Sequence, residues 1–467
     1  MIKVTVNKEK TIYADYGANL FELLTDNGFS FPGSCGGAGR CSRCTVYIGN
    51  KPYKSCHYIV TTDIEIETAA TIDMDILKGR SGDESQLHDI GEQAYDTGEH
   101  DSYGVAVDIG TTTIAMELIS VSEDGSYRSL SSYGVMNPQI RYGSDVIARI
   151  KYAGESSGLK EMSELLYEAL RAGIIRMCDE QSLSYKDIGR IALFGNTAML
   201  SIAAGVTTEN LGAYPFDLKD EIWLKDFRAD VIADELEADI YIPPAVSAFA
   251  GADIAGGALV LALDKRAGYN MLIDLGTNGE IILSGGEAPL CLSTACGPAF
   301  EEAFKKQGVF GSNICDMIAS LIKNHQIDRS GVITERFFDN GINMGQGIII
   351  DMDTVRSFQL AKAAIAAGIE IACKKAGIAY EDIEHVYIAG GFGFYLNPES
   401  AMYLGMFPKE FARKYVTVGN TSLKAAVKAL CDRDFDGRMK KFTKTAISVN
   451  LANEPEFNET YIRHIDF

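Results

Sequence analysis

The sequence predicts an α+β protein of several domains: a small β-rich domain, a linker and a large α/β domain with an internal duplication. Residues 1–68 contain short alternating segments around one short helix, which is typical of a small sheet. Residues 69–102 are polar and acidic with little periodicity, as in a linker. Within residues 103–467, apolar β-branched segments alternate with helical stretches, and one strand–turn–strand pattern occurs twice.

The first domain is expected to contain four main strands and one helix. The expected strands are IKVTV (residues 2–6), KTIYAD (10–15), CTVYIG (44–49) and IEIET (64–68). A helix is expected over ANLFELLTDNG (residues 18–28), because its apolar residues recur at helical spacing and a glycine ends the segment.

Four cysteines lie in or after the glycine-rich segment GSCGGAGRCSRC. They are Cys35, Cys41, Cys44 and Cys56, and we expect a hairpin between the last two. Four converging thiolates suit one iron-sulfur cluster, and the glycines allow tight bends that direct backbone N–H groups at the sulfurs. A structural zinc ion and a disulfide pair are the alternatives. His57 either tunes or replaces a ligand, or is a solvent-exposed neighbour.

The spacing C-x5-C-x2-C resembles that of plant-type and adrenodoxin-type [2Fe-2S] ferredoxins, although only eleven residues separate Cys44 from Cys56. The resemblance implies a β-grasp, ferredoxin-type fold for residues 1–68, with a [2Fe-2S] cluster bound to the four cysteines. Five other cysteines lie in apolar contexts and are expected in the core: Cys178, Cys291, Cys315, Cys373 and Cys431.

Composition limits the range of partners. The formal net charge of −21, without clusters of Lys and Arg, argues against nucleic acid and anionic membranes. No apolar run approaches 18 residues and no secretory signal is recognisable, so we expect a cytoplasmic protein. A mainly negative surface favours a partner with basic patches, or none.

Two segments of the large domain share one layout. VAVDIGTTTIAMELI (residues 105–119) and MLIDLGTNGEIILSG (271–285) each predict a strand, an Asp-x-Gly-Thr turn and a strand. Because Asp274 follows Asp108 by 166 positions, we expect a duplicated fold with two hairpins facing a cleft. Each turn offers small residues, free N–H groups, hydroxyls and a carboxylate, which suit a polyphosphate with a hydrated divalent cation. A third segment, VYIAGGFGFYL (386–396), predicts a strand and a glycine turn that lets the backbone approach an adenine and a ribose.

These three segments resemble the phosphate-1, phosphate-2 and adenosine motifs of the acetate and sugar kinase, Hsp70 and actin superfamily, and no P-loop motif competes with them. The resemblance implies a duplicated ribonuclease-H-like domain that binds ATP and Mg2+. The implied phosphate and magnesium contacts are Asp108, Gly110, Thr111, Thr112, Asp274, Gly276, Thr277 and Asn278, and the implied nucleoside contacts are Gly390, Gly391 and Gly393. Two small-residue helices, over residues 247–263 and 359–377, resemble the connecting helices of that superfamily or are ordinary core helices.

The order of domains resembles that of the reductive activators of corrinoid proteins. The resemblance is carried by the cysteine loop and by NPQIRYGSDVIARI (residues 137–150), FGNTAML (194–200), STACGPAFE (293–301) and AGGFGFYLNPESA (389–401). The chain passes from the linker directly to the first phosphate turn, so we expect it to lack the additional middle domain of longer members.

The resemblance implies an ATP-hydrolysing reductive activase. One electron from the [2Fe-2S] cluster would reduce inactive Co(II) of a corrinoid protein to Co(I), and ATP would supply the bias. Plant-type clusters have potentials of about −400 mV, and each ~59 mV of shortfall makes a one-electron reduction tenfold less favourable. The implied partners are a corrinoid protein of a methyltransferase system and an electron donor protein or reductant, and a homodimer is compatible with the sequence.

Several side chains have two interpretations. The catalytic candidates are Asp108, Asp274 and Glu301, because Glu301 or Glu302 would position the hydrolytic water. The alternative is that this carboxylate only interacts favourably with a helix dipole. Cys296 is a redox thiol or a small packed residue. Asp145 and Arg149 either reach the nucleotide cleft or form an i,i+4 pair.

Three other functions are alternatives. An ATP-dependent activator of a radical dehydratase would share one [4Fe-4S] cluster between two subunits, whereas here four cysteines lie in one small domain. A non-enzymatic redox sensor would bind nucleotide with negligible turnover. A small-molecule kinase would need an acceptor pocket, which the sequence does not reveal.

Overall fold

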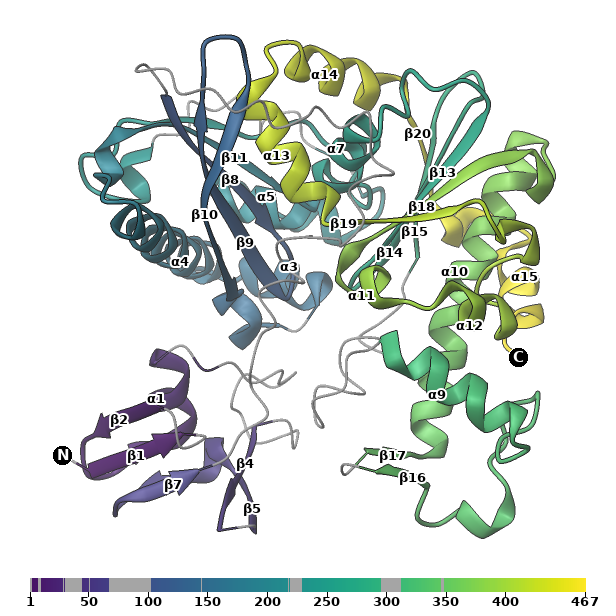
Figure 1. The fold of residues 1–467 in the computed structure, drawn as a ribbon, viewed down its shortest axis with the longest axis horizontal. Coiled ribbons are helices and arrows are strands. Elements are labelled where there is room, and N and C mark those ends of the chain that lie inside the picture. The colour runs from purple at the N-terminus through teal and green to yellow at the C-terminus, as the bar shows by residue number, and fades with distance from the viewer. Residues whose placement is uncertain are drawn as a thin grey trace.

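The computed structural model describes residues 2–6, 10–27, 29, 44–49, 51–66, 102–143, 145–216, 218, 229–294, 312–345 and 348–467. Figure 1 labels its helices and strands where there is room. The expected linker lies outside these residues except for Ser102, which starts a strand. None of the described helices combines the length and apolar character needed to span a membrane.

The N-terminal domain contains a sheet of order β2–β1–β7, in which β1 is antiparallel to β2 and parallel to β7. Its elements are β1 (Ile2–Val6), β2 (Lys10–Ala14), β3 (Ala18–Asn19), α1 (Leu20–Asp26), β4 (Thr45–Ile48), β5 (Lys51–Lys54), β6 (Ile59–Val60) and β7 (Ile64–Ile66). The four expected strands are confirmed, and so is the hairpin β4–β5 between the third and fourth cysteines. The helix begins two residues later than expected, because Ala18 and Asn19 pair with β6 and the Asn19 carboxamide accepts the N–H of Phe21.

The first sheet of the large domain has the order β10–β9–β8–β11–β12. Its strands are β8 (Ser102–Ile109), β9 (Thr113–Val121), β10 (Tyr127–Met136), β11 (Ile188–Gly195) and β12 (Asp239–Tyr241). The helices α3 (Val146–Ala153), α4 (Gly158–Glu180), α5 (Thr197–Ala203) and α6 (Glu209–Gly212) accompany it. The longest of these, α4, packs on β9 and β10, with Gly173 directly against Met116.

The second sheet has the order β19–β18–β13–β14–β15–β20. Its strands are β13 (Tyr269–Leu275), β14 (Gly279–Ser284), β15 (Leu290–Thr294), β18 (Ile383–Ala389), β19 (Tyr415–Gly419) and β20 (Ile447–Val449). The accompanying elements are α9 (Ser312–Lys323), β16 (Ile342–Gly345), β17 (Ile348–Ile350), α10 (Met352–Ala376), α11 (Gly390–Tyr395), α12 (Pro398–Tyr403) and α15 (Phe457–Arg463).

The two sheets repeat one topology, which confirms the expected duplication. In each, a central strand (β8 or β13) is antiparallel to the strand that follows its turn (β9 or β14) and parallel to a later strand on its other side (β11 or β18). The two sequence segments with the Asp-x-Gly-Thr turn are thus the equivalent hairpins β8–β9 and β13–β14. The carboxyl ends of the central strands carry the two turns.

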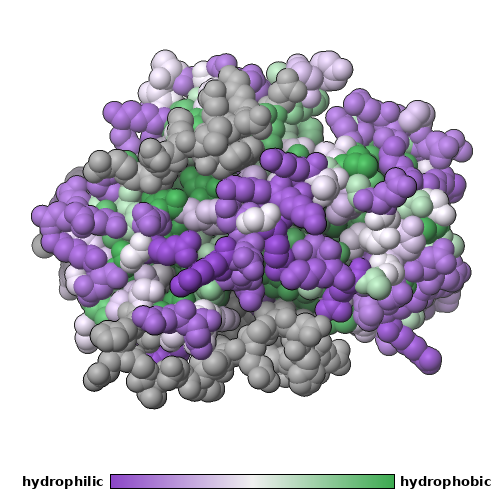
Figure 2. All heavy atoms as spheres, turned by 90° about the horizontal axis from the view of Figure 1, so that it is seen from above, coloured by the Kyte–Doolittle hydropathy of each residue, from purple (hydrophilic) through white to green (hydrophobic). Residues whose placement is uncertain are grey.

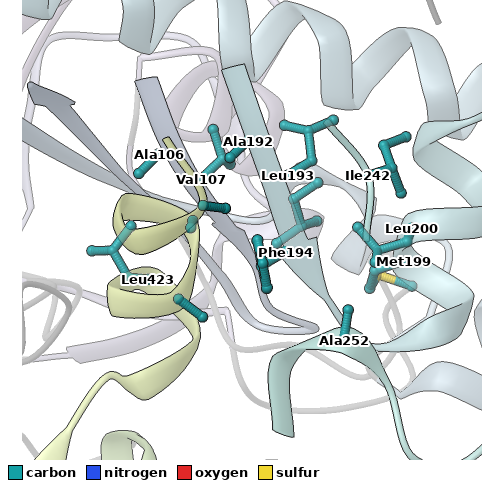
Figure 3. Close-up of a cluster of buried hydrophobic side chains, with 14 of the residues drawn as sticks. Ala106, Val107, Ala192, Leu193, Phe194, Met199, Leu200, Ile242, Ala252 and Leu423 are labelled. Carbon is teal, nitrogen blue, oxygen red and sulfur yellow. The ribbon is translucent and has the colours of Figure 1, made fainter. Parts of the chain in front are cut away.

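Two helices lie between the sheets: α7 (Ala252–Val260) and α13 (Thr421–Cys431), the latter followed by α14 (Phe435–Thr445). They cross closely because Gly256 of α7 lies against Ala425 of α13 and Phe194 of β11. Figure 3 shows Phe194 in this core, with Leu423 of α13 on one side and α5 on the other. Of the two small-residue helices, α7 connects the halves as the superfamily resemblance implies.

The other small-residue helix, α10, packs on the second sheet instead, with Gly368 close to Ile281 and Thr294. The strand residues alternate accordingly: Leu272 belongs to the core shared with α7 and α13, whereas Ile273 belongs to the core beneath α9 and α10. On the face shown in Figure 2, hydrophilic side chains predominate and apolar ones show between them in separate small areas. The apolar side chains are thus used mainly in these two cores.

Replacing Gly256 by Ala tests the helix crossing. An added Cβ would lie 2.6 Å from the Cβ of Ala425 and 2.7 Å from a ring carbon of Phe194, so we expect Gly256→Ala to lower the free energy of unfolding by about 1–3 kcal/mol. Gly437→Ala in α14 is the control, because nothing lies within 4 Å of its added Cβ; it should be neutral or stabilise by up to about 1 kcal/mol. Urea unfolding curves measure the free energy of unfolding of both variants. Equal values would show that α7 and α13 do not cross so closely at Gly256.

Candidate functional site

The two hairpin turns meet. The hydroxyl oxygens of Thr112, after β8, and Thr277, after β13, lie 3.4 Å apart, within hydrogen-bonding distance. The expectation that the hairpins face each other is therefore confirmed. Thr111 and Thr112 are buried, while Gly276, Thr277 and Asn278 are half-buried.

Hydrogen bonds and a close backbone contact hold the first turn in its conformation. An added Cβ at Gly110 would lie 2.8 Å from the carbonyl oxygen of Thr113, so only glycine fits there. The Asn137 carboxamide donates to the Gly110 carbonyl at 2.8 Å, and the Asn137 N–H donates to the Thr112 carbonyl at 2.9 Å. Asn196 caps α5 and also donates to the Thr111 hydroxyl at 3.2 Å. Two sequence motifs of unassigned role, around residues 137 and 196, thus shape this turn.

Arg149 completes the support. Its guanidinium is fully buried and donates to the carbonyl oxygens of Thr111 and Gly143, the latter at 3.0 Å. Asp145 instead caps α3 by accepting the N–H of Ala148 at 2.8 Å. Neither interpretation offered from the sequence is fully right, because Arg149 acts on the cleft only through the backbone of the turn, and Asp145 caps its own helix.

The carboxyl group of Asp108 lies one residue before the end of β8 and is held on both oxygens. Asn420 donates to Oδ2 at 2.9 Å and Ser422 donates to Oδ1 at 2.7 Å. Burial raises the pKa of Asp108, and the two hydrogen bonds oppose that shift by stabilising the carboxylate. The first turn aspartate is thereby fixed in orientation.

The equivalent aspartate of the second half, Asp274, has a different environment. An added Cβ at Gly390 would lie 2.4 Å from Asp274 Oδ1 and 2.4 Å from the Leu275 carbonyl, and Gly390 has a φ of +87°. Burial, followed by the charges of Asp253 and Asp108, raises the pKa of Asp274 to about 8. Gly390 is thus required for the backbone that passes behind this carboxyl group.

Sequence reasoning missed two further carboxyl groups. Asp253 is the second residue of α7, and burial with the charge of Asp108 raises its pKa to about 7. Glu280 pairs across the hairpin with Asp274 and is buried, and its pKa is raised by burial and by the three aspartates. Two signals in the sequence could have identified Glu280 and Asp253. One is an acidic residue in the apolar strand GEIIL, and the other is an acidic residue at the start of a small-residue helix. We call Asp108, Asp253, Asp274 and Glu280 the carboxyl cluster.

The third motif forms a helix start instead of the expected open turn. Gly390, Gly391 and Gly393 lie in α11, directly after β18. An added Cβ at Gly393 would lie 2.8 Å from the side chain of Ile388, so its lack of a side chain serves packing. Gly391 is exposed. Of the three, Gly391 is thus the glycine whose backbone is accessible to a ligand.

In the N-terminal domain, the structure brings together two of the four expected cluster ligands. The sulfur atoms of Cys44 and Cys56 lie 3.1 Å apart, too far for a disulfide bond of about 2.05 Å. Cys44 is buried, Cys56 is half-buried and His57 is exposed. Two converging thiols at the foot of a hairpin fit shared ligation of one iron by chemistry and position.

Several expected residues lie outside the described part of the chain: Cys35, Cys41, Cys296, Glu301 and Glu302. The expectation that five cysteines belong to the core is confirmed for Cys178, Cys291, Cys315 and Cys373, which are buried, and Cys431 is half-buried. Among described residues, no three His, Cys, Asp or Glu side chains are placed to bind one metal ion directly.

Replacing Gly390 by Ala tests the backbone behind Asp274. We expect Gly390→Ala to weaken Mg-ATP binding at least about tenfold, because the added methyl group would displace the Asp274 carboxyl group or the Leu275 carbonyl. Gly377→Ala is a matched control: it also has a left-handed φ of +67°, but nothing lies within 4 Å of its added Cβ. It should cost about 1–2 kcal/mol of stability and leave binding unchanged. Titration calorimetry measures the affinity of both variants for Mg-ATP. Equal affinities would contradict the conclusion that the backbone behind Asp274 requires glycine at position 390.

The carboxyl cluster predicts a pH dependence. Because Asp253 and Asp274 titrate near 7 and 8 in the folded protein and near about 3.9 when unfolded, the folded chain holds more protons in this interval. The free energy of unfolding from this source is therefore fully present below about pH 4 and falls as pH rises through 7 to 8. In EDTA, we expect scanning calorimetry to show a steeper fall of Tm from pH 6 to pH 8 in the wild type than in Asp274→Asn. Parallel slopes would contradict the raised pKa.

Among solved structures, a reductive activator for a corrinoid, iron-sulfur protein is similar to this chain, with a TM-score of 0.70, 22% identity, and coverage of 100% of this chain and 98% of the other. Among curated relatives, the corrinoid activation enzyme RamQ of Eubacterium limosum is 31% identical over 422 residues, which are 78% of this chain and 70% of the relative. The [Co(II) methylated amine-specific corrinoid protein] reductase of Methanosarcina barkeri is 26% identical over 426 residues, which are 78% and 77% of the two chains.

Two family models match the large domain. The model of the RACo middle region matches residues 103–266, which form the first half of the duplication. The model of the C-terminal domain of RACo, the ASKHA domain, matches residues 268–309 and 302–467, which confirms the expected superfamily of kinases, Hsp70 and actin. Because these matches cover most of the chain, it belongs to the RACo family, the reductive activators of corrinoid proteins.

Proposed function

We propose that this chain is an ATP-dependent reductive activase that returns a corrinoid protein from Co(II) to Co(I). The observation that carries the proposal is the contact between the turns at Thr112 and Thr277, backed by the carboxyl cluster, in a chain of this family. Both curated relatives are named for activation or reduction of corrinoid proteins. The overall change is Co(II) plus one electron giving Co(I), with ATP and water giving ADP and phosphate.

The facing turns are suited to a triphosphate. Their backbone N–H groups and the hydroxyls of Thr111, Thr112 and Thr277 would bind phosphate oxygens, and Asn278 would contact the second turn's phosphate. Asp108 and Asp274 would hold Mg2+ largely through water, which neutralises phosphate charge. The carboxyl cluster fits this cation, because without a positive charge its members raise one another's pKa values. Gly391 would lie at the nucleoside.

Asp253 is the described side chain best suited to accept a proton from the attacking water. Its pKa of about 7 matches the requirement for a general base near neutral pH. It lies at the start of α7, and the charge of Asp108 is among the causes of its raised pKa. Glu301 remains a second candidate for this role, because it belongs to the segment that follows β15.

The four N-terminal cysteines would hold the [2Fe-2S] cluster, with Cys44 and Cys56 on one iron and Cys35 and Cys41 on the other. The cluster supplies single electrons at low potential when bound. A hairpin with buried and half-buried thiols would limit water near the metal on that side, which favours the less charged oxidised state. A Co(II) corrinoid is typically harder to reduce than such a cluster, so the nucleotide-bound form would bind the partner in the state from which reduction is favourable.

The proposal includes a cytoplasmic location, an electron donor protein or reductant, and a corrinoid protein of a methyltransferase system as partner. A homodimer is compatible with it. The net charge of −21 indicates that docking uses basic or apolar groups of the partner.

Two variants separate the functions of the two domains. With a Co(II) corrinoid protein, reductant and Mg-ATP, we expect the wild type to produce the visible spectrum of Co(I). Cys56→Ala should lose the cluster spectrum and the reduction of Co(II) while keeping Mg-ATP binding. Asp274→Asn should keep the cluster spectrum and lose the ATP-dependent formation of Co(I). Cys291→Ala, at a buried cysteine of β15, is the control and should behave like the wild type.

Co(I) formation that is equally fast without ATP would contradict the proposed coupling. Negligible ATP turnover in the presence of reduced partner would favour the redox-sensor alternative.

A further inference from the structure

Asp108 belongs to the first half of the large domain, but both hydrogen bonds to its carboxyl group come from the segment that follows the second sheet. Asn420 and Ser422 begin α13 directly after β19, the edge strand of the second sheet. The helix then packs on β8, β9 and β11 of the first sheet and on α7. This short segment thus connects the strand end of one half to the turn aspartate of the other.

The geometry leaves Asp108 able to bind a ligand. Each carboxylate oxygen has two lone pairs, and the donors from Asn420 and Ser422 use one on each. Asn420 has a double function, because its side-chain oxygen caps α13 by accepting the N–H of Leu423 at 2.8 Å while its nitrogen donates to Asp108. The cap therefore fixes the donor.

The two halves of the duplication differ at the helices that start beside the turn aspartates. Asp253 is the second residue of α7 and Ser422 is the second residue of α13, and both helices start beside the turn aspartates. The start of α7 carries a carboxyl group, whereas the start of α13 contributes hydrogen-bond donors to Asp108. The donors at α13 oppose the effect of burial, which raises the pKa of Asp108, and so favour its carboxylate form.

We propose that Asn420 and Ser422 are positioning residues for magnesium-nucleotide binding, which hold the Asp108 carboxylate toward the cation and make its orientation depend on the strand end of the other half. This inference rests on the proposed function for the identity of the ligand. It assigns a role to two residues outside all the motifs recognised in the sequence.

The test measures binding of ATP with Mg2+ and of ATP in EDTA, by displacement of a fluorescent ATP analogue from the full-length protein. We expect Ser422→Ala to weaken binding of Mg-ATP by about tenfold or more, the usual scale for a hydrogen bond to a charged group. Binding of metal-free ATP should change less than about twofold, because Asp108 acts on the cation. Asn420→Asp keeps the acceptor for the helix cap but replaces the donor by a second carboxylate, so it should weaken Mg-ATP binding further.

Thr421→Val is the matched control. The hydroxyl of Thr421 is buried between the two positioning residues and has no hydrogen-bond partner among the described residues, so its removal should leave both affinities unchanged. Equal losses of Mg-ATP and metal-free ATP binding in Ser422→Ala would indicate a merely structural role and overturn the inference, as would wild-type affinity in both Ser422→Ala and Asn420→Asp. A wild type that binds Mg-ATP but produces no Co(I) would instead overturn the proposed function and leave this inference standing. A wild type that binds no Mg-ATP would overturn both.

Discussion

Four carboxyl groups enclosed at the meeting point of two sheets are the constraint on which the rest of the structure depends. Asp108 and Asp274 lie one residue before the ends of the central strands, the charge of Asp253 acts on Asp274, and all three aspartates act on Glu280. Burial is the main cause of their raised pKa values, and the charges of neighbouring carboxylates add to the shifts of Asp253, Asp274 and Glu280. A divalent cation bound with a polyphosphate would favour the ionised form of these carboxyl groups.

The neighbouring residues follow from this constraint. Close approach of backbone to carboxyl group requires glycine at Gly390, and the helix crossing that lets α7 and α13 reach the cluster requires Gly256. Arg149 is fully buried yet serves the first turn only through backbone carbonyl groups, so it shapes the cleft without entering it. The duplication supplies two equivalent hairpins, while differences at equivalent helix starts give the two aspartates unequal surroundings. Such asymmetry suits a site that has to bind one end of a triphosphate differently from the other.

Local patterns in the sequence were sufficient for the hairpins, the duplication and most strands, because each strand–turn–strand unit carries its own apolar alternation and turn residues. Glu280 and Asp253 were missed because their significance depends on long-range contacts with Asp274 and Asp108, which no local pattern reveals. The glycines of the third motif were assigned to the nucleoside, whereas the structure uses Gly390 for the Asp274 backbone and Gly393 for packing. The cluster ligands were identifiable from spacing, and two of them are adjacent in space.

The most direct test of the central claim is a count of the protons released when Mg-ATP binds. Titration calorimetry with preformed Mg-ATP, in buffers of equal pH 7 but different ionisation enthalpy, gives this count from the dependence of the heat on the buffer. The account predicts release of about one proton or more per Mg-ATP bound, because the cation lowers the pKa values of carboxyl groups that titrate near 7 and 8 in the free protein. Binding heats that are independent of the buffer would show that the cluster is already ionised at neutral pH, and would contradict the account.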